Sequence, residues 1–347
     1  MVTIKEIAKY CNVSIATVSN IINGKPNASK ETKERVLQAI EELNYTPNYI
    51  AKNLKTRRTR TIGVVVEDIT VFCAPEIIDG ITKCCEEKGY HILLTNLRLY
   101  KKFGDSYYGN EKFFQMVRRE AKELIAKQVD GIVYVTAHER TLKCLPENLT
   151  VPASMAYGYT KSENYPSVVV DDKKGAYEIV NYVISMGHKN IGVITGKERS
   201  IHTHDRLLGY QKALEENGII FHERDYVPIS FRKQTRHTRL WEFCQERLNE
   251  YTALFFASDF YASDAVFIFQ SQGIRVPQDI SVVGFDDNLF AEHCRPMLTT
   301  VQQHVADKAF YAFALLQRLI RGEECIEKNI HLPVKLVIRE SVQPLES

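Results

Sequence analysis

Hydrophobic positions at the start of the chain recur with the period of short helices. Apolar side chains from Ile4 to Cys11 fall on one helical face, and Thr3 with Glu6 matches the capping box that begins a helix. Ser14 is placed to cap a second helix. The inward positions of that second helix are Val18, Ile21 and Ile22. The pattern therefore predicts two amphipathic helices joined by a tight turn.

A third helix is predicted from about Ser29 to Leu43. Gly24 and Pro26 are stop signals that separate it from the second helix. Its apolar face is expected to bury Val36, Leu37, Ile40 and Leu43. A fourth short segment is expected from Pro47 through Leu54. The start of the chain is therefore predicted to be a small helical domain.

From Thr61 onward, apolar runs alternate with helical segments. The strand-like runs are Ile62–Val66, His91–Thr95, Gly131–Val135, Ser167–Val170, Ile191–Thr195, Ala253–Ala257 and Ile280–Phe285. Helical patterns between them include Glu76–Lys88, Lys173–Met186, Asp205–Asn217 and Asp259–Gln272. Continuous apolar strands separated by helices are typical of parallel sheets covered on both faces. Because the run at Ile62 is echoed at Ile191, two similar α/β lobes are expected.

The charge of the chain is unevenly distributed. The formal net charge is +2, but residues 1–60 contain eleven Lys and Arg against five acidic residues. The first sixty residues therefore carry +6 and the remainder carries −4. A basic helical domain on a mildly acidic body is the electrostatic pattern of a protein that binds a polyanion such as DNA.

Two helices joined by a tight turn within a basic domain predict a helix-turn-helix. In that motif the second helix enters the major groove of double-stranded DNA with its N-terminal residues at the base edges. The residues expected there are Ser14, Ile15, Ala16, Thr17, Ser19 and Asn20. The two-helix pattern alone is weak evidence, because any small helical bundle shows it. The capping signals and the positive charge make the prediction stronger.

The remaining composition narrows the class of protein. The 347 residues exceed what one hydrophobic core usually serves, so two or three folding units are expected. No export signal and no apolar run of about 20 residues is visible, so a cytoplasmic protein without a membrane segment is expected. The eight cysteines include no C-x-x-C pair and are expected to be free. No P-loop, nucleophile elbow or metal-ligand cluster is visible, so no enzyme activity, metal or cofactor is predicted.

The residues of the predicted helical domain resemble a known family. The stretches Thr3–Ala8, Val13–Ser19 and Ile22–Gly24 look like the DNA-binding head of the lactose repressor/galactose repressor family of bacterial transcriptional regulators. The likeness continues through Tyr45–Asn48 and Ala51–Leu54 and covers essentially the whole chain. It implies an α/β fold in which an N-terminal helix-turn-helix head precedes a two-lobed body of parallel sheets, like that of periplasmic binding proteins.

The resemblance implies a division of the chain into four parts. Residues 1–46 are expected to form the helix-turn-helix domain, and residues 47–60 a hinge helix and linker. Residues 61–160 with 291–322 are expected to form the N-terminal lobe of the effector domain. Residues 161–290 with 323–341 are expected to form its C-terminal lobe.

The resemblance also implies how the hinge and the head meet DNA. In this family the leucine that matches Leu54 inserts into the minor groove, where an apolar wedge bends the duplex. The alternative is that Leu54 is a linker residue packed on its own domain. Asn23 and Lys52 are expected to contact DNA as well. Family members often carry Arg where Asn20 stands, and since Arg favours guanine and Asn favours adenine, a shifted base preference is expected. A homodimer on a palindromic operator is predicted, because a two-fold protein mirrors a two-fold site.

In the body, the resemblance implies residues that bind a small-molecule effector. Ligands of open α/β sheets lie beyond the carboxyl ends of the strands. The positions that match the family there are Arg206, Ser258, Asp259 and Asp286. Phe72 and Cys73 stand where the family often has an aromatic pair, and they are expected to take its place. The alternatives are that Arg206 is an exposed helix residue and that Asp259 or Asp286 only caps a helix.

The function predicted from these patterns is a sequence-specific DNA-binding repressor controlled by an effector held between the lobes. A sugar is the expected effector, and a nucleotide or other metabolite acting as corepressor is the alternative. An α/β enzyme and a solute-binding transport protein are the other classes weighed, and both fit the basic helical head less well. The segment Leu97–Phe114, rich in aromatic and basic side chains, is expected to be a surface loop or an effector-facing lid.

Overall fold

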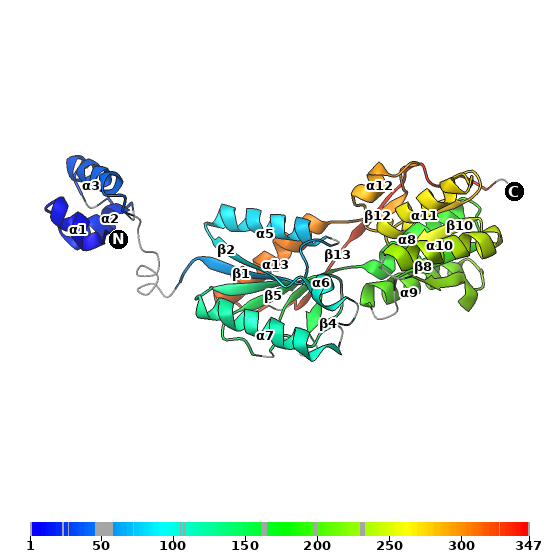
Figure 1. Cartoon of the computed structure of the whole chain (residues 1–347), viewed down its shortest axis with the longest axis horizontal. Coiled ribbons are helices and arrows are strands. Elements are labelled where there is room, and N and C mark those ends of the chain that lie inside the picture. The colour runs from blue at the N-terminus through cyan, green and yellow to red at the C-terminus, as the bar shows by residue number, and fades with distance from the viewer. Residues whose placement is uncertain are drawn as a thin grey trace. The chain divides into compact units, whose positions relative to one another are not determined.

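The structure, a computed structural model, describes most of the chain in two compact units. The described residues are 2–22, 24–26, 28–45, 58–71, 73–104, 106, 109–146, 148–160, 165–196, 200–229, 233–325 and 327–345. The first unit, Met1–Thr59, is the head, and the second, Arg60–Ser347, is the body. Figure 1 shows the helices and strands of both units.

The head contains three helices around a small apolar core. They are α1 (Ile4–Tyr10), α2 (Ile15–Ile22) and α3 (Lys30–Glu42). Thr3 and Glu6 form the predicted capping box of α1, Ser29 caps α3, and the Ser14 hydroxyl accepts the Thr17 N–H at 3.0 Å in the first turn of α2. The buried core is formed by Ile7, Ala8, Cys11, Val18, Ile21, Val36 and Ala39. Leu37, predicted to be buried, is instead 42% exposed, because Ala39 rather than Leu37 faces the core.

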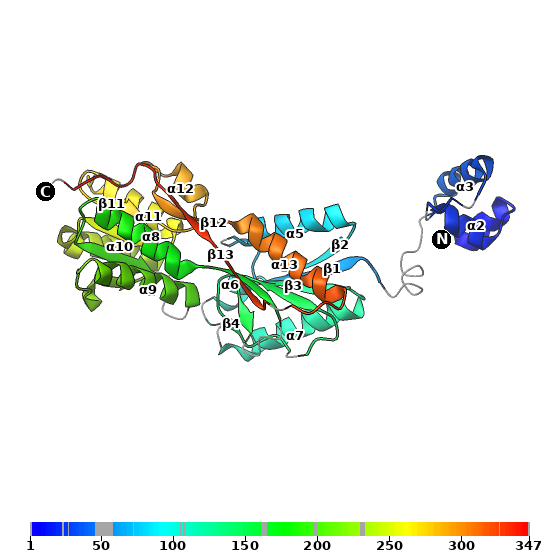
Figure 2. The same ribbon diagram turned by 180° about the vertical axis from the view of Figure 1, so that it is seen from behind.

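The body contains a first sheet of parallel strands. Its strand order is β13 (Asn329–Leu332), β7 (Ser167–Val170), β5 (Ala153–Ala156), β3 (Gly131–Val135), β1 (Thr61–Val66) and β2 (His91–Asn96). Neighbouring residues of one strand belong to different cores: Val64 packs in the core under α5 (Ala74–Lys88) and α13 (Val305–Ile320), and Val65 in the core under α7 (Glu111–Ala126). Figures 1 and 2 show α5 and α7 on opposite sides of this sheet. Burial on both faces explains why its strands read as continuous apolar runs.

A second, smaller parallel sheet has the same arrangement. Its order is β11 (Ser281–Val283), β10 (Ala253–Phe256), β8 (Ile191–Thr195) and β9 (Tyr226–Pro228). One face is covered by α8 (Asp172–Ser185) and α9 (Ile201–Glu216). The other is covered by α10 (Lys233–Arg247), α11 (Asp259–Ser271) and the short α12 (Leu289–His293). Each sheet with its helices is one lobe, as the repeated sequence pattern predicts.

The helices α8 and α9 pack unusually closely, and this approach depends on Gly209. A Cβ added at Gly209 would lie 2.2 Å from the Lys173 carbonyl oxygen and 2.8 Å from the Ala176 Cβ. Any larger side chain would therefore push the helices apart. Since α9 carries Arg206 and α8 begins at Asp172, this close packing fixes the distance between two residues of the site described below.

The chain passes between the lobes at three places, and the pairing there corrects the predicted lobe boundaries. It leaves the first sheet after β7, returns through β12 (Thr300–Gln303), and leaves again through β14 (Val334–Val337), which pairs antiparallel with β12. The ranges predicted for the second lobe, 161–290 and 323–341, include β7 and β13. Both strands pair in the first sheet instead. Conversely, Ala291 and Leu298 belong to a core of the second lobe. The sequence could not show this, because strand order is set by pairing between distant segments.

The segment Leu97–Phe114 is not a simple surface loop. Its described part includes the helix α6 (Leu99–Phe103) and the start of α7. Leu99 and Phe113 are 0% and 1% exposed and pack in the core beneath α7. Its aromatic side chains are explained at least in part by this packing rather than by contact with a ligand or nucleic acid.

Candidate functional site

The first candidate surface lies on α2 of the head. Ser14, Ile15 and Ala16 are exposed, and Thr17, Ser19 and Asn20 are partly exposed. Val18 and Ile21, on the inward face of the helix, are 0% and 4% exposed and hold α2 against α1 and α3. The residues predicted to read bases therefore lie on the outward face of the helix, where a DNA groove can reach them.

Capping and positive backbone angles shape the turn before α2. Asn12 has a φ of 48°, a left-handed conformation that Asn tolerates better than most residues. The Val13 N–H then bonds the Ala8 carbonyl oxygen at 3.0 Å, which closes α1. The Ser14 and Thr17 hydroxyls lie 2.8 Å apart at the start of α2. The predicted DNA contacts Asn23, Lys52 and Leu54 lie outside the described residues, as does most of the predicted hinge.

The second candidate site is centred on Arg206 in α9. Its side chain is 2% exposed, its Nε donates to Asp172 Oδ1 at 2.7 Å, and its Nη1 lies 3.2 Å from Asp286 Oδ1. Nη1 also donates to the Ala257 carbonyl oxygen, and the guanidinium carbon lies 3.7 Å from the centroid of the Phe285 ring. Burial lowers the pKa of Arg206, but the two aspartates outweigh this effect and raise it overall. Arg206 is thus a buried cation and not an exposed helix residue.

Asp286 connects Arg206 to two further polar side chains. Its Oδ2 accepts a hydrogen bond from the Ser258 hydroxyl at 2.8 Å, and its Oδ1 accepts one from Gln303 Nε2 at 2.6 Å. The backbone of Asp286 has a φ of 123°, an uncommon conformation for a residue other than glycine. The structure therefore brings together three of the predicted effector residues, Arg206, Ser258 and Asp286.

Asp259 lies next to these residues but has a different set of partners. It is fully buried, its Oδ1 accepts from the Thr300 hydroxyl at 2.6 Å, and its Oδ2 accepts from the Asn288 N–H at 3.2 Å. A Cβ at Gly284 would lie 2.1 Å from Asp259 Oδ1, so only glycine fits there. These contacts give Asp259 a bracing role between the start of α11 and the β12 crossover.

Several residues of the same region were not predicted from the sequence. Together with Arg206, Ser258, Asp286 and Gln303 they form what we call the polar cluster; the additional members are His138, Glu139, Tyr157, Asp172, His202 and Lys308. Lys308 Nζ donates to Gln303 Oε1 and lies 4.0 Å from the centroid of the Tyr157 ring. Tyr157 stacks on His202, with ring centroids 6.1 Å apart, and His202 meets His138 edge to face at 5.8 Å. Asp172 could have been found, because it follows the predicted strand Ser167–Val170 at its carboxyl end.

Burial controls the protonation of the polar cluster. Burial, with the nearby Asp172 carboxylate, raises the pKa of Glu139 to about 8, so Glu139 is largely protonated at neutral pH. Burial also lowers the pKa of His138 and of His202 well below the usual value, so both imidazoles are neutral. The pKa of Asp172 and of Asp286 is raised by burial, although Arg206 opposes this effect in both.

The polar cluster contains buried polar atoms without hydrogen-bond partners among the described residues. These atoms are Arg206 Nη2, Asp172 Oδ2, Glu139 Oε2 and His202 Nδ1. Burying a polar atom without a partner is costly, and such atoms are rare in native proteins. Unsatisfied donors and acceptors gathered in one place therefore indicate where a polar ligand binds.

The two other predicted effector residues are Phe72 and Cys73. Phe72 lies outside the described residues. Cys73 precedes α5, and its Sγ lies 3.9 Å from Lys308 Nζ, which places it at the edge of the polar cluster. Burial raises the pKa of the Cys73 thiol, so it is uncharged at neutral pH.

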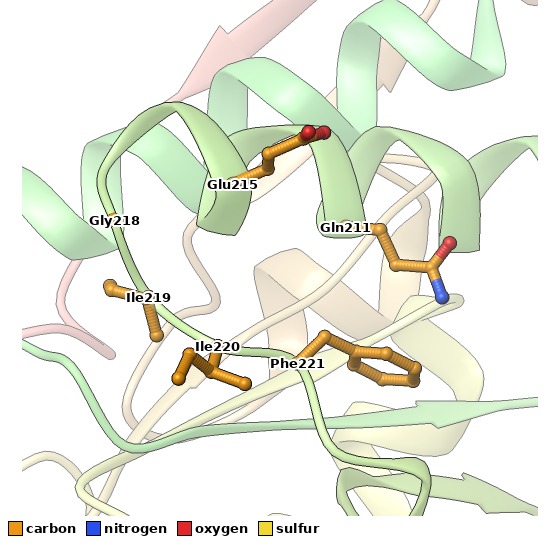
Figure 3. Close-up of a pocket in the computed structure, with 6 residues that line it drawn as sticks. All are labelled: Gln211, Glu215, Gly218, Ile219, Ile220 and Phe221. Atoms are coloured by element: carbon orange, nitrogen blue, oxygen red, sulfur yellow. The ribbon is translucent and has the colours of Figure 1, made fainter.

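A separate pocket lies on the second lobe. It has a volume of about 450 Å³ and is lined by Gln211, Glu215, Gly218, Ile219, Ile220 and Phe221. Figure 3 shows Gln211 and Glu215 on α9 and the apolar side chains on the segment that follows it. None of the residues of the polar cluster lines this pocket, and its mostly apolar wall lacks buried charges. We assign no effector role to it.

Comparison with known proteins gives the family. Residues 3–48 match the model of the bacterial regulatory proteins of the lacI family, and residues 180–342 match the periplasmic binding protein-like domain. The HTH-type transcriptional regulator RegA of Clostridium saccharobutylicum is 34% identical, with 98% of each chain covered. No helix within the described residues has both the length and the apolar character needed to cross a membrane.

Solved structures with the same architecture agree with this family. A lac repressor dimer bound to operator and the anti-inducer ONPF is 25% identical, with a TM-score of 0.81 and 99% of each chain covered. A complex of the transcriptional regulator CelR with cellobiose is 27% identical, with a TM-score of 0.69, and covers 98% of this chain and 100% of its own. The relatives are transcriptional regulators rather than enzymes. The chain therefore belongs to the lacI family of bacterial regulatory proteins, as a DNA-binding repressor with an effector-binding domain.

Proposed function

We propose that this repressor binds a palindromic operator as a homodimer and that a sugar bound at the polar cluster controls its affinity for DNA. The observation that carries the sugar assignment is the mixture of unpartnered donors and acceptors at one buried place. Arg206 Nη2 offers a donor, whereas Asp172 Oδ2 offers an acceptor. A sugar hydroxyl both donates and accepts, so adjacent hydroxyls satisfy such a mixture.

The aromatic rings of the polar cluster favour a sugar over a nucleobase. A flat base is usually held by stacking on an open aromatic face. The guanidinium of Arg206 covers Phe285, and Tyr157 is 4% exposed and already faces Lys308. These contacts occupy faces of Phe285 and Tyr157 on which a base would otherwise stack. The complex of the similar regulator CelR with cellobiose also supports a sugar.

For DNA recognition we propose that Ser14, Ile15, Ala16, Thr17, Ser19 and Asn20 meet the base edges of each half-site. Their support is the outward face of α2 and the basic character of the head. Asn23, Lys52 and Leu54 complete the proposed contacts, with Leu54 in the minor groove. A dimer places two such helices in successive major grooves of a palindrome.

The experiment is a titration of DNA binding with sugars. A palindromic operator is first selected from random DNA and labelled, and fluorescence anisotropy then gives its affinity for the full chain at fixed salt. Neutral sugars, sugar acids, sugar phosphates and nucleobases are added in turn. We expect one sugar to change operator affinity, and by linkage the operator changes sugar affinity by the same factor.

Two variants separate the two functions. Ser258→Ala removes the hydroxyl that donates to Asp286 and should weaken the sugar response while basal operator binding is kept. Ser271→Ala, at the far end of the same helix, is the matched control, because its hydroxyl bonds the Ile268 carbonyl oxygen and the Gln272 side chain and no residue of the polar cluster. A nucleobase that shifts operator affinity while every sugar is inert would contradict the proposal.

A further inference from the structure

Lys308 indicates the chemical class of the sugar. We propose that the effector is a sugar acid whose carboxylate pairs with the buried ammonium group of Lys308, an inference that rests on the sugar effector proposed above. No part of the sequence analysis selected this residue. It stands in the first turn of α13, and its side chain is 0% exposed.

Lys308 differs from the other buried cations of the body. Within the described residues, four Lys or Arg side chains are buried. The three arginines each have a carboxylate partner: Arg140 pairs with Glu67, Arg206 with Asp172 and Asp286, and Arg236 with Asp264. No described carboxylate lies within ion-pair distance of Lys308. Lys308 is therefore the buried cation without a carboxylate in direct contact, although its charge opposes, from a longer distance, the rise that burial causes in the pKa of Asp172 and of Asp286.

The neighbours of Lys308 are polar or polarisable but uncharged. Its Nζ donates to the amide oxygen of Gln303, lies 4.0 Å from the Tyr157 ring centroid, and lies 3.9 Å from Cys73 Sγ. An ammonium group has three hydrogens to donate, and the acceptors in contact with this one are the Gln303 amide oxygen and the weakly accepting Cys73 Sγ. A fold that keeps such a group gains most when a ligand supplies the anion.

Gln303 links Lys308 to Asp286 through two hydrogen bonds. Its amide oxygen faces Lys308, while its Nε2 donates to Asp286 Oδ1 at 2.6 Å. Asp286 is at the same time bound by Arg206 and by Ser258. The carboxylate of Asp286 is thus bound by residues of the second lobe and by Gln303, and the ammonium group on the first lobe remains available to a ligand that also contacts Asp286.

The arrangement suits a carboxylate better than a phosphate. A phosphate dianion is usually held by several N–H donors, such as a helix N-terminus or a bidentate arginine. Arg206 is already bound to Asp172 and Asp286 and keeps only Nη2 without a partner, so the site offers Lys308 and this single N–H group rather than several converging donors. A carboxylate can accept from Lys308 while the hydroxyls of the same ligand fit the donors and acceptors around Arg206.

Isothermal titration calorimetry on the full chain tests the inference with matched pairs of probes. Galactose is compared with galacturonate, glucose with glucuronate and with gluconate, and glucose 6-phosphate serves as the phosphate probe. We expect at least one acid to bind about tenfold or more tightly than its neutral counterpart, since tenfold is a modest value for a charge-assisted hydrogen bond. Lys308→Met keeps the length of the side chain without its charge and should remove that preference, so that the ratio of acid to neutral-sugar affinity falls to about one.

Two results overturn the inference but leave the sugar effector in place: neutral sugars bind as well as their acids, or Lys308→Met keeps the preference for the acid. Tighter binding of glucose 6-phosphate than of any carboxylate also overturns it. If only nucleobases bind, both proposals fail.

A second measurement needs no ligand. Removing an unpaired buried charge should raise the melting temperature of the free protein, by about 2–4 °C for each kcal/mol of unfavourable burial relieved. Lys308→Met is therefore expected to melt higher than the unmodified chain in calorimetry. A lower melting temperature would mean that Lys308 stabilises the fold itself, and the inference would be wrong.

Discussion

Removing the charge of Arg206 should destabilise the body in a way that depends on pH. Arg206→Met leaves Asp172 and Asp286 without their cation, and the Asp172 side chain is 1% exposed in the present pair. Breaking a buried ion pair by removing one partner costs about 3–5 kcal/mol, because the remaining charge is buried alone. For a unit of this size, 1 kcal/mol shifts the melting temperature by about 2–4 °C. The expected decrease is thus on the order of 10 °C at pH 8.

Acid should partly reverse this loss. Burial already raises the pKa of Asp172, and without Arg206 its pKa rises further. At pH values between the pKa of Asp172 in the unfolded chain and its raised pKa in the folded variant, the folded state binds a proton that the unfolded state does not. Stability is therefore greater at low pH and falls as the pH rises through that window. The difference between variant and parent should be smaller at pH 5.5 than at pH 8.

Differential scanning calorimetry of the full chain at both pH values measures these effects, with Arg275→Met as the matched control. Arg275 also pairs with an aspartate, Asp279, at 2.6 Å, but its side chain is 69% exposed. Solvent screens such a pair, so the control should melt within about 2 °C of the parent. If Arg206→Met melts as high as the control at pH 8, the buried ion pair does not hold the lobe together and the reasoning is refuted.

Three further predictions concern other parts of the chain. Asn20→Arg should change the base preferred beneath that residue from adenine to guanine in binding-site selection, and selection of guanine by the unmodified chain would contradict this. Gly209→Ala should lower the melting temperature, because its Cβ would lie 2.2 Å from the Lys173 carbonyl oxygen; Gly218→Asn, at a φ of 68° with open space around it, is the control and should be tolerated. Glu139→Gln should raise stability at pH 8 and flatten its pH dependence, because a carboxyl whose pKa is raised to about 8 loses stability as the pH rises toward that value. A Glu139→Gln variant that is less stable than the parent at pH 8 would show that the ionised group is favourable there.

The three described helices of the head could be predicted from the sequence, because their signals are local. The capping residues Thr3 and Ser29 and the helical spacing of apolar positions lie within a few residues of the elements that they define. In the body, Arg206 and Asp286 were predicted because they match sequence elements of the family, and Asp286 also follows the strand β11. The structure brings the two side chains within 3.2 Å of each other.

The other members of the polar cluster depend on contacts between distant segments. Lys308 meets Cys73, 235 positions earlier in the chain, and a lysine at the start of an amphipathic helix is ordinarily solvated. The strand Ala153–Ala156 was missed for a different reason: alanine, serine and methionine favour strands weakly, and its place in the middle of the sheet decides its conformation. Local patterns carry no information about either effect.

The strand order of the body has a consequence for synthesis on the ribosome. The lobe whose first strand is made earliest, at Thr61–Val66, receives its edge strand β13 only at Asn329–Leu332, and its covering helix α13 only shortly before. The strands β8 to β11 of the other lobe have all emerged by Val283. A nascent chain can therefore complete the second sheet while the first sheet still exposes an apolar face and an unpaired edge. Nascent chains in such a state are prone to aggregate. Termination before Asn329 should therefore leave the sheet that is begun first without its edge strand β13, although all strands of the other sheet are already present.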